Sequence, residues 1–122
     1  MTIYALSSGP GLSGLAVIRV SGEGALDILQ KITNEQIPIP RVATLRNISK
    51  LGSDEIIDRG IILWFPGPGS YTGEDLIELH IHGSLAVINE IQKTLSKFEN
   101  CRLAEPGEFT KLAFQNGKIN LL

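Results

Sequence analysis

A carboxylate and two imidazoles occupy alternate positions of one short segment, as Glu78, His80 and His82. In an extended strand, side chains two residues apart point to the same face and are separated by about 6.7 Å along the strand. The residues between them are apolar and would face the opposite way, toward a core: Ile77, Leu79 and Ile81. Polar groups on a partly buried strand are costly without partners, so this face is the candidate binding surface.

Three interpretations of this polar face are open. A His-x-His pair beside a carboxylate could hold a divalent metal, although three ligands from one strand would need long reach and lack a fourth partner nearby. The face could also be a half-exposed strand surface without a ligand. The third interpretation explains the presence of Glu78 better: its carboxylate accepts two parallel hydrogen bonds from a heterocycle such as a 2-amino-4-oxo pteridine. Such a ring has neighbouring N–H donors at the spacing of two carboxylate oxygens.

Two basic residues elsewhere are candidates for contacts with anions. Arg19 interrupts the apolar segment LAVIRV at residues 15–20, where an arginine is usually an edge residue or the partner of a buried anion. Lys118 directly follows Gly117, and its spacing alone indicates only a solvated lysine. The residues themselves do not decide either role.

Two glycine motifs of nucleotide-binding proteins are incomplete in this sequence. Residues 9–14 match the GxGxxG dinucleotide fingerprint, which requires a helix directly after the loop. The short β-branched segment at residues 15–20 follows instead, so a turn between two strands is expected. The phosphate-binding pattern GxxxxGK[ST] is absent, since Gly73 is followed by Glu74 rather than by lysine. We therefore expect no GTPase activity from this chain itself.

The composition is that of an ordinary globular domain. The 122 residues are 43% hydrophobic and 20% charged, with a net charge of −2 that gives no general argument for nucleic acid. The single cysteine, Cys101, excludes an internal disulfide and fits a reducing cytoplasm. The sequence stops in the apolar pattern at residues 119–122, from which we expect a fragment of a longer protein.

Hydrophobic periodicity and turn residues predict an α+β domain with antiparallel pairing. The connection rich in Gly and Pro at residues 66–69 leads into the strand that carries Glu78. A helix is expected to begin at Ser21, a second after the capping residue Ser84, and a third near Pro106 that ends at Asn116 and Gly117. The remaining expected elements are strands at residues 2–6, 15–20, 44–48 and 56–65, and a short extended segment at 101–104.

Four segments together resemble the N-terminal domain of bacterial tRNA-modification GTPases of the MnmE (TrmE) type. FPGPxS[YF]TGED and PGEFT…AFxNxK are the specific motifs among them. The segments span nearly the whole chain: TIYAL (2–6), GLSGLAVIRVSG (11–22), LWFPGPGSYTGEDLIELHIHG (63–83) and RLAEPGEFTKLAFQNGKINLL (102–122). The resemblance implies that residues 1–122 are one such domain, related in fold to the tetrahydrofolate domain of the glycine-cleavage T protein.

The resemblance also implies a ligand and a site. The family's N-terminal domain binds a one-carbon tetrahydrofolate, either 5-formyl- or 5,10-methylene-tetrahydrofolate, and forms a homodimer. The family's folate-contacting arginine falls on Arg19, its pterin-contacting glutamate on Glu78 and its lysine on Lys118. Three separately weak signals thereby become one predicted site, with the loop at residues 65–75 as a further wall.

For the whole protein, the resemblance implies a helical domain and an inserted GTPase domain that binds GTP, Mg²⁺ and K⁺. With the flavoprotein MnmG, such proteins add a carboxymethylaminomethyl group at position 5 of the wobble uridine of certain tRNAs. Two departures from the family pattern are present. Leu12 stands where the family's first loop, usually GRGG, has its arginine. His80 stands where relatives often have a glutamine. The alternatives are a metal-binding enzyme domain that uses Glu78, His80 and His82, or an assembly module without a ligand.

Overall fold

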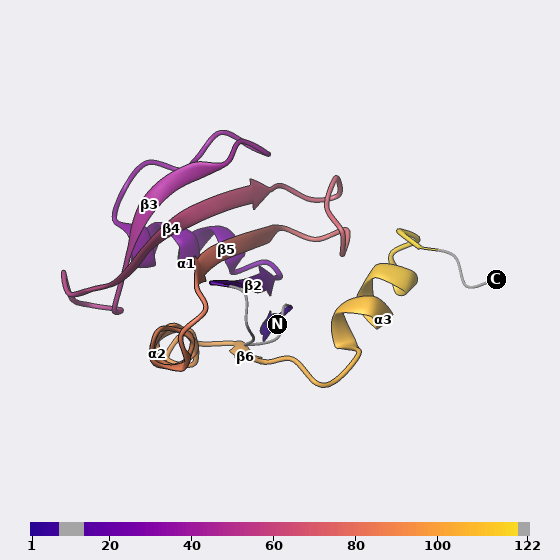
Figure 1. Cartoon of the computed structure of the whole chain (residues 1–122). Helices are drawn as coiled ribbons and strands as arrows, with labels where there is room; N and C mark the ends of the chain where they lie inside the picture. Colours follow the sequence, from indigo (N-terminus) through magenta and orange to yellow (C-terminus); the bar gives the residue numbers. More distant parts are fainter. Residues whose placement is uncertain (8–13, 120–122) are drawn as a thin grey trace.

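The computed structural model describes residues 1–7 and 14–119 and contains one mixed sheet with three helices (Figure 1). The strands are β1 (Thr2–Leu6), β2 (Leu15–Ser21), β3 (Thr44–Ser49), β4 (Ile56–Phe65), β5 (Leu76–His82) and β6 (Cys101–Leu103). The helices are α1 (Ala25–Thr33), α2 (Leu85–Leu95) and α3 (Glu108–Gln115). Within the described residues, no helix is long and apolar enough to cross a membrane.

The strand order β3-β4-β5-β2-β1-β6 places β5 and β2 in the interior of the sheet. Every neighbouring pair is antiparallel except β1 and β6, which are parallel. This mixed, largely antiparallel sheet confirms the predicted α+β class. The relationship to the glycine-cleavage T protein stays a prediction. Because β5 and β2 are direct neighbours, the segments that carry Glu78 and Arg19 lie side by side although they are far apart in sequence.

One face of the sheet forms the core with α1 and α2. Alternate residues of β2, β4 and β5 point into this layer, and Trp64 belongs to it. Each fully buried aliphatic side chain contributes about 1.5–3 kcal/mol relative to an exposed one, so this layer is the main source of stability. Its largest fully buried side chains are Ile18, Ile28, Leu29, Ile32, Ile48, Ile62, Ile77, Leu79, Ile81, Ile91 and Leu95.

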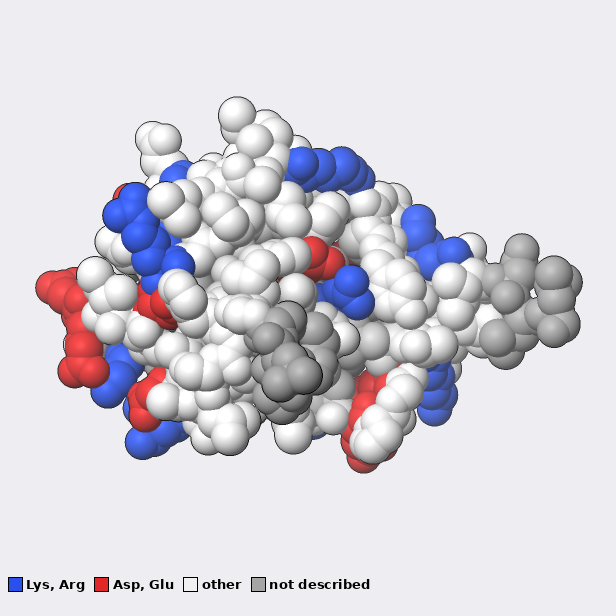
Figure 2. All heavy atoms as spheres, in the orientation of Figure 1, with Lys and Arg blue, Asp and Glu red and all other residues white. Residues whose placement is uncertain are grey.

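The opposite face of the sheet carries the polar row predicted from the sequence. The burial of β5 alternates as expected: Ile77, Leu79 and Ile81 are buried, whereas Glu78 and His80 are only half-buried. Large apolar side chains also remain accessible on this face, with Leu15 62% exposed and Leu45 47% exposed. Figure 2 shows mostly uncharged atoms over the middle of the view, with a few acidic and basic atoms among them.

Of the first two predicted helix starts, one is wrong and one is confirmed. The predicted start at Ser21 is wrong: β2 continues through this residue, and α1 begins at Ala25 after the N-cap residue Gly24. The Ser21 hydroxyl does not cap a helix because it is buried against Thr72. The predicted cap at Ser84 is confirmed, since its Oγ accepts from the backbone N–H of Val87 over 3.2 Å.

The third helix lies beyond the ends of the strands, beside the connection between β4 and β5 (Figure 1). It begins at Glu108, two residues after Pro106, and ends at the C-cap residue Asn116 as predicted. Gly117 has φ = 71°, which glycine adopts without strain and which suits the residue after a helix. Of the helix residues, Ala113 is buried. The position of α3 therefore depends on contacts with the neighbouring connection, described below.

Candidate functional site

Arg19 and Glu78 form the centre of the candidate site. They are direct cross-strand partners in the register of β2 and β5, so both side chains point to the same face of the sheet. Arg19 Nε donates a hydrogen bond to Glu78 Oε2 over 2.9 Å. The Glu78 side chain is only 13% exposed, whereas that of Arg19 is 34% exposed. The structure thus brings two of the three predicted site residues into direct contact.

The second oxygen of Glu78 also has a partner. His80 Nε2 lies 2.9 Å from Glu78 Oε1, on the same strand and the same face. Burial alone would raise the pKa of the Glu78 carboxyl group, but the hydrogen bonds from His80 and Arg19 outweigh it and lower that pKa below its ordinary value. Glu78 is therefore a carboxylate at neutral pH and acts only as a hydrogen-bond acceptor.

Tyr71 connects Arg19 to the loop and to α3. The guanidinium carbon of Arg19 lies 5.5 Å from the centroid of the Tyr71 ring, which is the geometry of a cation–π contact. The Tyr71 hydroxyl lies 3.4 Å from Thr110 Oγ1 in the first turn of α3. Reasoning from the sequence placed Tyr71 in the loop wall but did not predict its contact with Arg19, because no local pattern encodes a pairing over this separation.

The loop between β4 and β5 is held by hydrogen bonds at several points. Ser21 Oγ lies 2.8 Å from Thr72 Oγ1 and donates to Glu74 Oε1 over 3.2 Å. Asp75 Oδ1 accepts from the backbone N–H of Gly67 over 2.9 Å, which closes the loop on itself. These bonds attach the loop to β2 and make it a defined wall beside Arg19.

Lys118, the third predicted site residue, contacts this loop rather than the other two. Its Nζ donates to the carbonyl oxygen of Pro68 over 2.9 Å. Asn116 Nδ2 donates to the carbonyl oxygen of Thr72 over 2.8 Å, so two side chains at the end of α3 bind the same loop. Lys118 is thereby joined to Arg19 through the loop and through Tyr71, not by a direct contact.

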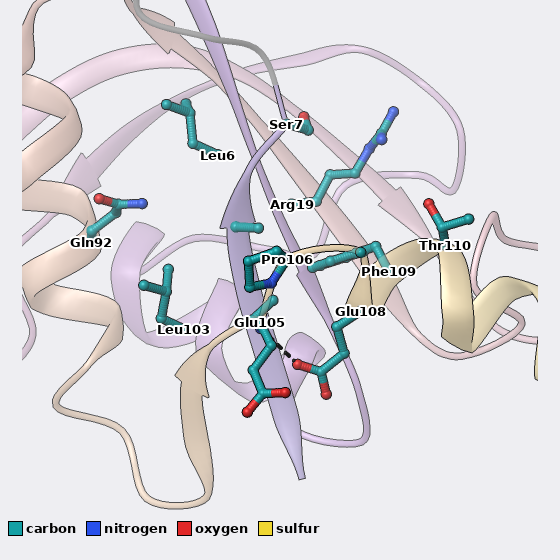
Figure 3. Close-up of a pocket in the computed structure, with 13 residues that line it drawn as sticks. Leu6, Ser7, Arg19, Gln92, Leu103, Glu105, Pro106, Glu108, Phe109 and Thr110 are labelled. Atoms are coloured by element: carbon teal, nitrogen blue, oxygen red, sulfur yellow. Dashed lines mark hydrogen bonds between the residues drawn. The ribbon is translucent and has the colours of Figure 1, made fainter.

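A pocket of about 490 Å³ opens next to Arg19 (Figure 3). Figure 3 shows Arg19 on one side of it, Pro106 and Phe109 near its middle, and Gln92 from α2 at the opposite side. The remaining lining residues come from the end of β1, from β6, from the segment that leads into α3 and from the first turn of α3: Ala5, Leu6, Ser7, Leu103, Ala104, Glu105, Gly107, Glu108 and Thr110. The pocket has mixed polar and apolar walls of a size suited to a small planar ligand.

Arg102 and Glu108 brace the segment that forms the pocket wall. The two guanidinium nitrogens of Arg102 donate to the two carboxylate oxygens of Glu108 over 2.8 and 2.6 Å. Glu108 Oε1 also accepts from the backbone N–H of Glu105 over 2.9 Å. The hydrogen bond from Arg102, followed by that from Glu105, lowers the pKa of Glu108 to about 2. This bidentate pair links β6 to the first residue of α3.

The geometry does not assemble the ligands that the metal hypothesis requires. His82 turns away from Glu78: its Nδ1 lies 2.7 Å from Asp58 Oδ1, and its backbone N–H donates to Asp58 Oδ2 over 2.9 Å. Over residues 1–7 and 14–119, no group of three or more His, Cys, Asp and Glu side chains could hold a metal ion.

Cys101 is half-buried, and burial raises the pKa of its thiol, so it is protonated at neutral pH.

Comparison with known sequences identifies the family of this chain. The family described as GTP-binding protein TrmE N-terminus matches residues 2–118. The chain belongs to this family. The TrmE N-terminal match includes the segments that carry Arg19, Glu78 and Lys118. The family's usual loop arginine corresponds to Leu12, which lies outside the described residues.

Relatives with high identity are tRNA modification proteins. The tRNA modification GTPase MnmE of Pelagibacter ubique is 65% identical over 122 residues, which are 100% of this chain and 28% of that protein. MnmE of Zymomonas mobilis is 51% identical over 98% of the chain and 28% of the relative. The human mitochondrial 5-taurinomethyluridine-tRNA synthase subunit GTPB3 is 49% identical over 98% of the chain and 25% of the relative. The TrmE N-terminal chain thus spans about a quarter of the length of these relatives.

Proposed function

We propose that this chain is the folate-binding and dimerisation domain of a cytoplasmic tRNA modification GTPase. The ligand is a one-carbon tetrahydrofolate, 5-formyl- or 5,10-methylene-tetrahydrofolate, and Arg19, Glu78 and Lys118 are its binding residues. In the whole protein, a GTPase domain with GTP, Mg²⁺ and K⁺ works with an MnmG-type flavoprotein on the wobble uridine of tRNA. The chain contributes the one-carbon donor's binding site and no catalytic residue of its own.

The observation that carries this proposal is the state of Glu78. Its carboxylate is largely buried, has a lowered pKa and accepts one hydrogen bond on each oxygen, from Arg19 and from His80. Each carboxylate oxygen can accept a second hydrogen bond. A pterin presents two neighbouring N–H donors, which match these two acceptor positions. Among the described residues, Glu78 does not belong to a group of three or more possible metal ligands, so its buried acceptor pair fits a neutral planar heterocycle better than it fits a cation.

The surroundings of Glu78 fit the rest of a folate molecule. The pocket beside Arg19 includes Pro106 and Phe109, which can cover an aromatic ring. Arg19 has five N–H donors in total, and its hydrogen bond to Glu78 is made by Nε, so the terminal guanidinium nitrogens can also contact an anionic glutamate tail. Lys118 adds a second positive charge at the loop. These features support Arg19 and Lys118 as partners of the polar groups of the ligand.

Dimerisation is supported by the face of the sheet that α1 and α2 leave uncovered. A hollow of about 370 Å³ on this face has mostly apolar walls, including Leu15, Leu45, Ile61 and Leu63, and it borders His80. Leu15 and Leu45 are large exposed apolar side chains in a region that also carries the candidate site. A second copy of the chain would remove this apolar surface from water, which is the usual driving force for homodimers.

Isothermal titration calorimetry with 5-formyltetrahydrofolate tests the proposal. The chain should bind, and Glu78→Gln should weaken binding by about 5- to 150-fold, which corresponds to the 1–3 kcal/mol cost of unpaired N–H groups. Glu90→Gln is the matched control, because Glu90 lies on α2 at the opposite face of the sheet. A folded dimer that shows no heat of binding at about millimolar folate, and no ligand-dependent rise in melting temperature, would instead be an assembly module without a ligand.

A further inference from the structure

His80 lies beside Glu78 on the polar face of β5. It lies on β5 between Val17 of β2 and Ile61 of β4, its direct cross-strand partners. Both neighbours are apolar, so the imidazole is held between two strands and its side chain is only 31% exposed. Its Nε2 approaches Glu78 Oε1 to 2.9 Å. The Glu78 carboxylate therefore has His80 at one oxygen and Arg19 at the other.

The direction of this hydrogen bond follows from the chemistry of the pair. A carboxylate has no hydrogen to donate, so the hydrogen between Glu78 and His80 belongs to His80 Nε2. The terminal torsion of a glutamate side chain is soft and has no sharp preferred angle. One N–H donor on each oxygen restrains this rotation and fixes the plane of the carboxylate. A ligand that needs both oxygens in its own plane then loses less freedom on binding.

The second histidine of the strand is a natural comparison. His82 also belongs to the polar row of β5, yet it pairs with Asp58 rather than with Glu78. Its side chain is 68% exposed, about twice the fraction of His80. Two histidines of the same strand therefore have different partners, and only His80 touches the carboxylate. Replacement of His82 alters the same segment without altering the environment of Glu78.

We infer that His80 is a positioning residue that orients the Glu78 carboxylate for recognition of the pterin N–H groups. This inference rests on the proposed folate-binding function. His80 does not itself need to contact the ligand; it acts by supplying an N–H donor to Glu78 Oε1. A side chain of similar reach that also supplies an N–H donor, such as glutamine, should therefore preserve the function, and an aliphatic side chain should not.

The test compares His80→Leu, His80→Gln and His82→Leu with the original chain in titrations with 5-formyltetrahydrofolate. His80→Leu should weaken binding by about tenfold or more, whereas His80→Gln and His82→Leu should remain within about threefold. A second readout needs no ligand: the carboxyl carbon of Glu78 is titrated by ¹³C NMR in each variant. The pKa of Glu78 should rise in His80→Leu and stay low in His82→Leu, because only the former removes a hydrogen bond that lowers it.

The outcomes separate this inference from the function on which it rests. If Glu78→Gln loses folate while His80→Leu binds as tightly as the original chain, the inference is overturned and the folate proposal stands. If His80→Gln loses as much affinity as His80→Leu, the N–H donor is not the relevant property, and the inference is overturned as well. If the original chain binds no folate, both proposals fail together. Rescue by His80→Gln, with an unchanged His82→Leu, supports the inference.

Discussion

Arg19 on β2 and Glu78 on β5 lie directly opposite each other, and Arg19 Nε donates to Glu78 Oε2 over 2.9 Å. The two residues are 59 positions apart in sequence. Their contact sits at the boundary between the loop wall and the uncovered face of the sheet, since Tyr71 of the loop stacks against Arg19.

Removal of Arg19 should make the stability of the chain less dependent on pH in the acidic range. The folded-state pKa of Glu78 is below its ordinary value of 4.5, so the pair stabilises the fold above that pH, and this stability is lost as the pH falls through the folded-state pKa. Arg19→Met should cost about 1 kcal/mol near neutral pH, since the pair is partly solvated. Urea denaturation near pH 7 and at about pH 3 measures the difference in free energy of unfolding between the original chain and Arg19→Met. This difference should shrink on acidification. The exposed Arg59 on β4 provides the control variant Arg59→Met. A difference that does not change with pH would contradict the pairing.

Gly60 should tolerate no side chain, because β4 passes very close to β5 at this residue. A Cβ atom there would lie 2.3 Å from the carbonyl oxygen of His80, and backbone atoms cannot move aside cheaply. Gly60→Ala should lower the free energy of unfolding by about 2–4 kcal/mol, as overpacking does. Thermal and urea denaturation measure this loss. Gly14→Ala is the control, since a Cβ there would have no heavy atom of the described residues within 4 Å, and its effect should stay within about 0.5 kcal/mol. Equal stabilities of the two variants would contradict this close approach.

Lys118 should affect binding more than stability. Its ammonium group is at the surface and donates to the carbonyl oxygen of Pro68, so Lys118→Ala should change the free energy of unfolding by less than about 0.5 kcal/mol. Affinity for 5-formyltetrahydrofolate should fall by about three- to tenfold, because one positive charge is lost beside the loop. Calorimetry of Lys118→Ala and of the control Lys97→Ala, an exposed lysine just after α2, measures the effect. Identical affinities of the two variants would remove Lys118 from the site.

The uncovered face of the sheet should be sensitive to charge if it is the dimer interface. Leu45 is 47% exposed on this face, and Leu45→Glu would place a carboxylate in the apolar contact. The dissociation constant of the dimer should rise at least about tenfold, because a charge loses its hydration at such an interface. Sedimentation equilibrium measures it. Leu85→Glu is the matched control, because Leu85 is 63% exposed at the start of α2 on the other side of the sheet. A dimer unaffected by Leu45→Glu would place the interface elsewhere.

Much of the local structure could be predicted from the sequence, because it depends on neighbouring residues. Glu78, His80 and His82 share one face because side chains of an extended chain alternate between two faces. The cap at Ser84 depends on one backbone N–H group three residues away. The start of α1 was predicted wrongly because that prediction used only the residues next to Ser21. Ser21 has the chemistry of a cap, but its hydroxyl is taken by Thr72, 51 positions away.

The partners within the site were decided by the tertiary structure. The resemblance to the family implied that Arg19, Glu78 and Lys118 form one group, but the sequence does not say which of them touch. Strand pairing brings Arg19 to Glu78, whereas Lys118 reaches Pro68 instead. The two histidines flank Ile81 in the same strand, yet they have different partners. His80 bonds to Glu78, whereas His82 bonds to Asp58.

By itself, then, the sequence determined the elements, the polar face of β5 and the family to which the motifs belong. These features arise from backbone periodicity, turn chemistry and short motifs, which involve residues close together in the chain. Only the folded chain decided the strand order and register, the Arg19–Glu78 contact and the separate roles of the two histidines. Those features depend on how buried surfaces of distant segments fit together, and a linear pattern does not contain that information.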